Sequence, residues 1–281
     1  DPRWQIARIA GSPQSGHRPT EAFKTPLKIM AILSAFGRDA TPEWDGLYSA
    51  IKKARQAGLP IRLHVGTGQE ALQDSILELS QADAEVTQFP LNSLVDLAAE
   101  ANVFLPQIVH FFCHGSTSFA KPRLELATIN DDDDSSIELA LDDLLGIRGF
   151  KESWLTVLNC CDSAAASEDV HSLTHNLVAG GVNAAIGMKE TVSEVDAYEF
   201  SSRLYPAILA KLRETLTPLA IGDEAVLDWA ATLWAPRKAI EERHRREGRP
   251  NAHQWTLPVL YAQLDPFRVK GAAAAEAVRR D

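Results

Sequence analysis

The segments PQIVHFFCHG (106–115) and SWLTVLNCCDS (153–163) decide the fold. Each is a short apolar run that ends in small or reactive polar residues. A strand that is apolar on both faces is typical of a parallel sheet with helices covering both sides, because neither face meets water. Both segments are therefore predicted to be buried parallel strands of an α/β protein.

An alternation of strands and helices extends outward from these segments. Strands are expected at 27–34, 60–66, 84–90 and 181–189, a final strand-like run lies at 255–264, and helices are expected at 44–58, 70–82, 93–102, 171–181 and 194–215. The runs 123–129 and 135–141 alternate around a loop of four acids, which indicates a hairpin at one edge of the sheet. We predict a mostly parallel sheet of about six strands with helices on both faces.

The ends of the chain differ in composition from its middle. Residues 1–25 are polar with several Gly and Pro, and we interpret them as a linker or lead-in. Residues 26–268 are expected to form one domain, followed by an Ala-rich tail at 269–281. The chain begins with Asp1 instead of Met, so we expect it to be a piece of a longer protein.

Charge and cysteine content restrict the class of protein. The formal net charge is −10, from 38 acidic and 28 basic residues, and no Lys/Arg stripe interrupts it. Direct binding of nucleic acid is therefore not expected. No apolar run approaches the ~18 residues that span a membrane. Three cysteines, two of them adjacent, do not form a disulfide framework, which favours a reduced, cytoplasmic protein.

Two predicted strands end in residues suited to nucleophilic catalysis. The first leads into His114 and Gly115, and the second into Cys161. Ligands of open parallel sheets bind at the carboxyl ends of the strands. If the two strands are neighbours, an imidazole and a thiol meet at one edge, as a His/Cys dyad requires. The backbone N–H groups of Gly115 and Cys161 are candidates for an oxyanion hole, and Gly115 lets the chain turn beside a substrate.

The adjacent thiols of Cys160 and Cys161 compete for the role of nucleophile. Successive side chains of a strand point to opposite faces, so only one of them faces His114. Cys161 lies nearer the exit of the strand into DSAAAS and has better access to substrate. We assign the nucleophile to Cys161 and keep Cys160 as the alternative.

Four segments resemble, in order, the motifs of the CHAT domain, a caspase-like and separase-related peptidase module. They are HFFCHG, LTVLNCCDSA, THNLVAGGVNAAIGMKETVSEVDAYEFSSRLYPAIL and WTLPVLYA. The resemblance implies a caspase-like three-layer fold and a cysteine endopeptidase that hydrolyses a protein substrate. It places the catalytic His at His114 and the catalytic Cys at Cys161. Cys160 stands where the family usually has Ala.

The resemblance also implies a substrate pocket and a mode of regulation. In the caspase-like clan, the residue two before the nucleophile lines the pocket; here it is Asn159. Further candidates for substrate binding are Asp162, Lys189, Glu190, Glu194 and Asp196, whose mixed charges leave the specificity open. Family members usually follow a sensor or repeat region, and in bacteria they often serve regulated proteolysis in defence.

Two other classes of function remain as alternatives. The first is a catalytically silent interaction module on the same scaffold. The second is a dinucleotide-binding enzyme, because residues 66–71 (GTGQEA) fit G-x-G-x-x-A; however, Glu70 would place a carboxylate in the pyrophosphate turn.

No metal or cofactor is expected. Cys113, His114, Cys160 and Cys161 lack the spacing of a zinc site. The consecutive acids at 131–134 likewise lack the alternate spacing of a calcium loop.

Overall fold

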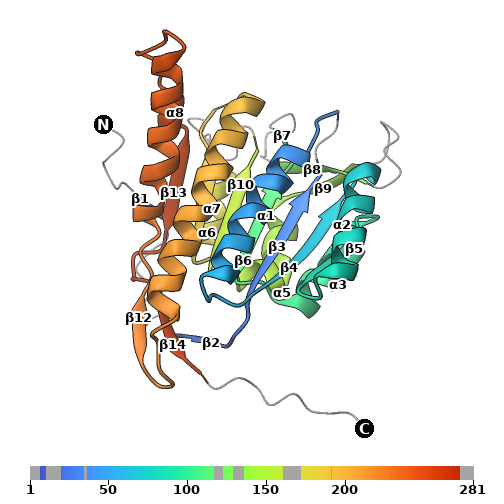
Figure 1. The fold of residues 1–281 in the computed structure, drawn as a ribbon, viewed down its shortest axis with the longest axis vertical. Coiled ribbons are helices and arrows are strands. Elements are labelled where there is room, and N and C mark those ends of the chain that lie inside the picture. The colour runs from blue at the N-terminus through green and yellow to red at the C-terminus, as the bar shows by residue number, and fades with distance from the viewer. Residues whose placement is uncertain are drawn as a thin grey trace.

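The computed structural model describes residues 7–10, 20–34, 37–116, 123–128, 136–160, 172–190 and 192–272. Its centre is an eight-stranded sheet (Figure 1). From one edge to the other, the strands are β1 (Ala7–Ile9), β13 (Pro258–Ala262), β11 (Ala184–Met188), β10 (Leu155–Asn159), β6 (Ile108–Phe112), β3 (Leu27–Leu33), β4 (Ile61–Thr67) and β5 (Val86–Pro90). Within this sheet only β11 and β13 pair antiparallel, so the predicted mostly parallel sheet is confirmed.

Helices cover both faces of the main sheet. One hydrophobic cluster joins the sheet to α1 (Thr41–Gln56), α2 (Glu70–Ala82) and α7 (Glu194–Leu216), and we call this side the first face. A second cluster involves α3 (Leu94–Phe104), α4 (Leu141–Gly146), α5 (Arg148–Lys151) and α6 (Leu173–Ala179), on the second face. Helix α8 (Trp234–Arg246) packs beside α7 and projects beyond the neighbouring strands (Figure 1).

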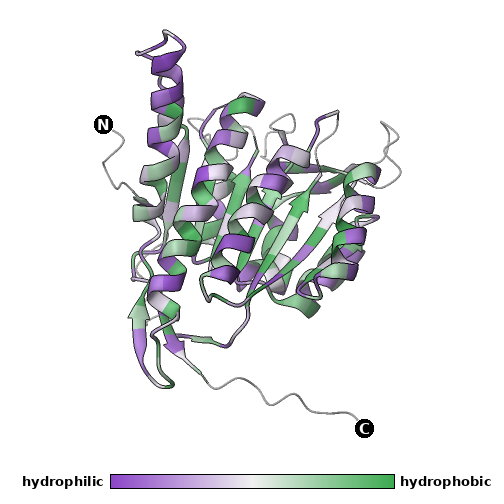
Figure 2. Cartoon of the chain, in the orientation of Figure 1, coloured by the Kyte–Doolittle hydropathy of each residue, from purple (hydrophilic) through white to green (hydrophobic). Residues whose placement is uncertain are grey.

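Side chains of the central strands alternate between the two faces. In β6, Ile108 belongs to the first-face cluster and Val109 to the second. In β10, Val157 and Leu158 divide in the same way. Figure 2 shows the resulting distribution, with hydrophobic residues on the strands and hydrophilic residues on the outer part of α8. Apolar residues on both faces of a strand thus correspond to two separate cores.

The sheet contains two more strands than the six expected. One is β13, the strand-like run near the carboxyl end of the chain. The other is β1, which lies within the segment 1–25 that we interpreted as a lead-in. The run of Ala7, Arg8 and Ile9 is too short to give a strand pattern, and β1 forms because β13 offers an unpaired edge.

The hairpin forms, but it does not lie at an edge of the main sheet, and this part of the prediction is wrong. Strands β8 (Arg123–Ala127) and β9 (Ser136–Leu139) pair antiparallel, and β8 also pairs with β7 (His114–Ser116). They make a separate three-stranded sheet. Its position follows from β7, which begins only two residues after the central strand β6 ends.

A third sheet joins one strand from the amino-terminal part of the chain to two from its carboxyl-terminal part. It consists of β12 (Glu224–Val226), β14 (Arg268–Gly271) and β2 (Glu21–Phe23). The boundary proposed at residue 25 therefore follows closely after β2, and the boundary proposed at residue 268 falls within β14. Two short 3₁₀ helices, Ala230–Leu233 and Gln254–Thr256, flank α8. Among the described residues, the helices are too short or too polar for any of them to cross a membrane.

Candidate functional site

The two strands that lead toward His114 and Cys161 are neighbours in the sheet. Strands β6 and β10 pair in parallel, with Phe112 opposite Asn159 at their carboxyl ends. His114 and Gly115 follow at the start of β7, and both are half-buried. Cys161 and Asp162 lie outside the described residues. The strand adjacency that the dyad requires is thus present.

The other two cysteines face the apolar interior of the second face. Cys160 is 4% exposed and Cys113 is 6% exposed, and both belong to the cluster that contains Phe111 and Leu158. A thiol enclosed by hydrocarbon is shielded from substrate and packs as a small apolar group. The burial of Cys160 therefore argues against it as the nucleophile.

The order in which successive strands are added to the sheet reverses between β3 and β6, and the carboxyl ends of these two strands lie next to each other. From β3 the chain continues to β4 and β5 on one side, whereas β6 and β10 lie on the other. Such a switch point opens a crevice at the carboxyl ends of the strands. A cleft of about 260 Å³ lies on this edge, lined by Ser34, Gly37, Arg38, Asp39, Gly68, Gln69 and Ala127. Ser34 donates its N–H to the carbonyl of Phe112 at 2.9 Å, so the cleft adjoins the end of β6.

Charged side chains in this cleft are held by neighbouring elements. Asp39 accepts hydrogen bonds from the backbone N–H of Thr41 at 2.9 Å and from Gln69 Nε2 at 3.2 Å. These bonds, those with Thr41 foremost, lower the pKa of Asp39. Arg38 Nε lies 3.5 Å from Glu194 Oε1 in the first turn of α7. The sequence reasoning missed Ser34, Arg38 and Asp39, because it searched strand ends only for a nucleophile and a base.

A buried polar cluster lies on the first face, below the ends of β6 and β10. Glu43 Oε1 accepts a hydrogen bond from Asn159 Nδ2 at 3.0 Å, and Glu43 Oε2 accepts one from Ser201 Oγ at 2.6 Å. His110 Nε2 lies 2.9 Å from Glu43 Oε1, an ion-pair distance at which the ring is not aligned for a hydrogen bond. Asn159 also donates to the carbonyl of Ala197 at 3.2 Å. The side chain of Asn159 is thus 2% exposed and directed toward α1 and α7.

The loop after β11 carries two of the predicted substrate-binding residues. Lys189 and Glu190 are both exposed to solvent. The backbone N–H of Lys189 donates to the carbonyl of Leu257 at 2.9 Å, which fixes the start of the loop. Glu190 Oε2 lies 3.4 Å from Nε2 of the exposed His253. Both side chains are accessible to a bound molecule.

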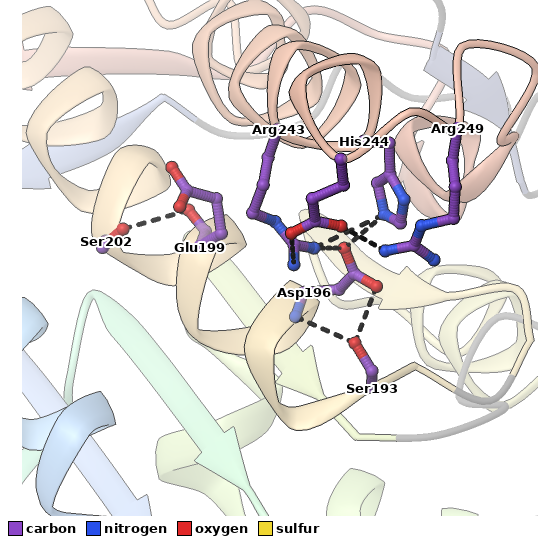
Figure 3. A network of polar contacts seen from close by, with 8 residues as sticks. Ser193, Asp196, Glu199, Ser202, Arg243, His244 and Arg249 are labelled. Atoms are coloured by element: carbon purple, nitrogen blue, oxygen red, sulfur yellow. Dashed lines mark hydrogen bonds and ion pairs between the residues drawn. The ribbon is translucent and has the colours of Figure 1, made fainter.

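Asp196 has a different environment from Lys189 and Glu190. Only 4% of it is exposed, and its carboxylate accepts a hydrogen bond from Ser193 Oγ, the N-cap of α7, at 2.7 Å. It also forms ion pairs with Arg243 and with His244, whose Nε2 is 2.9 Å from Asp196 Oδ1 (Figure 3). These contacts join the first turn of α7 to α8.

The G-x-G-x-x-A turn packs against protein atoms. A Cβ at Gly68 would collide with the carbonyl of Ala127 and lie 2.8 Å from Ser34 Oγ. The N–H of Gly68 donates to Ser34 Oγ at 3.1 Å, and Ser34 donates in turn to Ala127. Gly66 faces the ring of Phe89. The glycines therefore permit close packing of this turn against β5 and β8, and the N–H of Gly68 already has an acceptor.

We expect NAD⁺ and NADP⁺, each at about 1 mM, to raise the melting temperature of the chain by less than about 1 °C. A dinucleotide present at a concentration of 100 times its Kd would stabilise the protein by about 2.7 kcal/mol. This stabilisation would raise the melting temperature by several degrees. Differential scanning fluorimetry measures the shift, with a known NAD-dependent dehydrogenase run alongside. An increase of several degrees would restore the dinucleotide alternative.

Comparison with known proteins identifies the fold and the family of this chain. The mostly parallel sheet with helices on both faces is a caspase-like fold, similar to that of a cysteine proteinase. The model of the CHAT domain matches residues 49–217, more than half of the chain. The chain therefore belongs to the CHAT domain family, and the resemblance seen in the sequence is confirmed.

Two of the similar solved structures are much longer than this chain. The Arg-specific cysteine proteinase gingipain R superposes with a TM-score of 0.51 at 9% identity, over 85% of this chain and 46% of that one. The separase of the Saccharomyces cerevisiae separase–securin complex gives 0.42 at 14% identity, over 90% of this chain and 13% of that one. This chain thus spans less than half the length of either. No curated protein sequence matches it.

Proposed function

We propose that this chain is a cysteine endopeptidase in which His114 and Cys161 form the catalytic dyad. The register of β6 and β10 carries the proposal. His114 is two residues beyond Phe112, and Cys161 is two residues beyond Asn159, the residue paired with Phe112. The two residues therefore leave neighbouring strands at the same edge of the sheet, His114 at the start of β7 and Cys161 directly after Cys160. In this proposal the thiol of Cys161 lies on the first face, opposite to Cys160, because successive residues of a strand alternate.

In the proposed reaction, the imidazole of His114 accepts the proton of the Cys161 thiol. The sulfur attacks the carbonyl carbon of the scissile peptide bond and forms a tetrahedral oxyanion. The backbone N–H groups of Gly115 and Cys161 donate hydrogen bonds to this oxyanion. His114 then protonates the leaving amine as the C–N bond breaks, and water hydrolyses the thioester to release the acid and restore the thiol.

The substrate in this proposal is a protein segment that lies across the carboxyl edge of the sheet. The exposed Lys189 and Glu190, together with Asp162, are proposed to contact it. Asn159 contributes by holding the end of β10, because its amide is buried between α1 and α7. We leave Asp196 out of this set, since its carboxylate is buried in ion pairs.

Regulation by an upstream sensor or partner is also part of the proposal. The family resemblance supports this view, as it supports a role in regulated proteolysis in bacterial defence within the cytoplasm. A CHAT domain that follows such a region would remain inactive until the region receives its signal.

Labelling by an electrophile tests the proposal. A peptidyl acyloxymethyl ketone is expected to alkylate Cys161 in the wild type, and the rate in His114→Ala should be at least about 100-fold lower, because the base that forms the thiolate is missing. Mass spectrometry of the digested protein identifies the labelled cysteine.

Denatured protein serves as the control, since all three thiols then react equally in both variants. If the folded wild type resists labelling both alone and with its upstream region, the silent interaction module is the better description.

A further inference from the structure

We infer that Glu43 is a positioning residue for the catalytic dyad, an inference that rests on the proposed function. Its buried carboxylate ties together the two strands that lead to the dyad and the helix that covers them. His110 lies on β6, four residues before His114, and Asn159 lies on β10, two residues before Cys161. Ser201 lies on α7. No residue of this cluster belongs to the catalytic dyad itself.

The geometry of the cluster fixes both oxygens of the carboxylate. Oε1 is 2.9 Å from His110 Nε2 and 3.0 Å from Asn159 Nδ2, and Oε2 accepts the Ser201 hydroxyl at 2.6 Å. Glu43, His110, Asn159 and Ser201 are each at most 2% exposed. One carboxylate thus contacts two adjacent strands near their carboxyl ends. A relative shift of β6 and β10 would break at least one of these contacts.

Burial of this carboxylate calls for an explanation, because removing a charge from water is costly unless partners compensate for it. Glu43 lies in the first turn of α1, where the partial positive charge of the helix N-terminus favours an anion. The ring of Tyr205 packs edge-on against His110 at 5.3 Å between centroids. Burial, together with the nearby Glu43, raises the pKa of Tyr205 well above its usual value, so its hydroxyl stays neutral. An apolar residue would fill this space at lower cost but would not fix the strand ends.

The cluster continues into the first turn of α7. Asn159 donates to the carbonyl of Ala197, the residue that follows Asp196. Asp196 in turn binds Arg243 and His244 of α8 (Figure 3). The start of α7 is therefore held from both sides, by the strand ends and by α8. This arrangement gives Glu43 a rigid support.

We expect Glu43→Gln to slow alkylation of Cys161 without weakening binding of the reagent. The amide keeps the size of the side chain but removes its negative charge and replaces one of the two acceptor oxygens, so either Asn159 or Ser201 loses its acceptor. A displacement of reacting groups by about 1 Å costs up to about 100-fold in rate. The limiting rate of inactivation by the peptidyl acyloxymethyl ketone should fall 10- to 100-fold, with its half-saturating concentration changed by less than about threefold.

Three further measurements separate positioning from mere loss of structure. The total fraction of Cys161 labelled at long times reports how many molecules are competent, and it should equal that of the wild type. Ser201→Ala, which removes one hydrogen bond with little change in volume, should give a smaller slowing of a few fold. Glu100→Gln removes the carboxylate 3.1 Å from His64 Nε2 on β4, away from the dyad strands, and should leave the limiting rate unchanged.

The results distinguish this inference from the proposed function. A wild type without labelling contradicts the proposed function. A wild type that is labelled, with Glu43→Gln reacting at a limiting rate within about twofold of it, overturns the role of Glu43 alone. That role is also overturned if Glu43→Gln reacts at the normal rate but only a small fraction of its molecules is labelled.

Discussion

Cys161→Ala is expected to lower kcat/KM for cleavage of a protein substrate by at least about 1000-fold, whereas Cys160→Ala should keep it within about threefold of the wild type. Alanine at 161 removes the sulfur that attacks the carbonyl, and no other group on that face replaces it in the proposed mechanism. Alanine at 160 removes only a buried sulfur from the second-face cluster. Both substitutions replace a cysteine by alanine at neighbouring positions, but only Cys161→Ala is expected to abolish cleavage.

Cleavage can be measured with a proteome-derived peptide library, followed by kinetics on a peptide that the wild type cuts. Circular dichroism and thermal unfolding of both variants establish that each is folded. Loss of cleavage in Cys160→Ala together with retention in Cys161→Ala would reverse the assignment of the nucleophile. Equal cleavage by both variants would remove the thiol mechanism altogether.

Asp196→Ala is expected to lower the free energy of unfolding by about 3–5 kcal/mol. The substitution leaves Arg243, whose side chain is 13% exposed, and the buried His244 beside each other without their shared carboxylate. It also removes the acceptor of the Ser193 hydroxyl at the start of α7. Urea denaturation followed by circular dichroism measures the loss, and α8 is the element expected to detach first.

Glu152→Ala is the matched control for this prediction. It breaks an Arg–carboxylate pair with Arg148 in which the side chains are 65% and 55% exposed, so water already solvates both charges. Such a surface pair contributes about 0–1 kcal/mol. If Asp196→Ala costs no more than Glu152→Ala, the cluster in Figure 3 does not hold α8 to α7.

Several features of the fold could be predicted because they depend on local pattern alone. The runs 27–33, 108–112 and 155–159 carry apolar residues on both faces, which is typical of strands in a covered parallel sheet. The helix expected at 44–58 has its counterpart in α1, and Gly58, the last residue of the expected range, adopts a φ of +91° just beyond that helix. Helix α7 was predicted from its spacing of apolar residues, and its start coincides with a Ser193 cap.

The candidate site was predictable only in part. His114, Gly115 and Cys161 were found because each follows a recognisable strand, and chain order makes strand ends easy to locate. Glu43 gave no signal, because it lies among the polar residues at the start of a helix, where acids are common. Its partners His110, Asn159 and Ser201 are 67 or more positions away, and only the folded chain brings them to it.

Asp196 shows that the sequence around a residue does not reveal which distant side chains will cover it. Its position after a strand made it a candidate for substrate binding, but α8, which begins 38 residues later, covers its carboxylate with Arg243 and His244. The pairing of β1 with the edge strand β13, and of the hairpin with β7, likewise depends on which strand edges remain unpaired in the folded chain.

The sequence by itself determined the class of fold, the family and the residues that carry the proposed chemistry, since these follow from apolar pattern and from motifs that are contiguous in the chain. The tertiary structure alone decided that β6 and β10 are neighbours, that Cys160 faces the interior, and that Glu43 joins the strand ends to α7. The physical reason is that pairing and burial arise from contacts between distant segments, and these contacts exist only after the chain has folded.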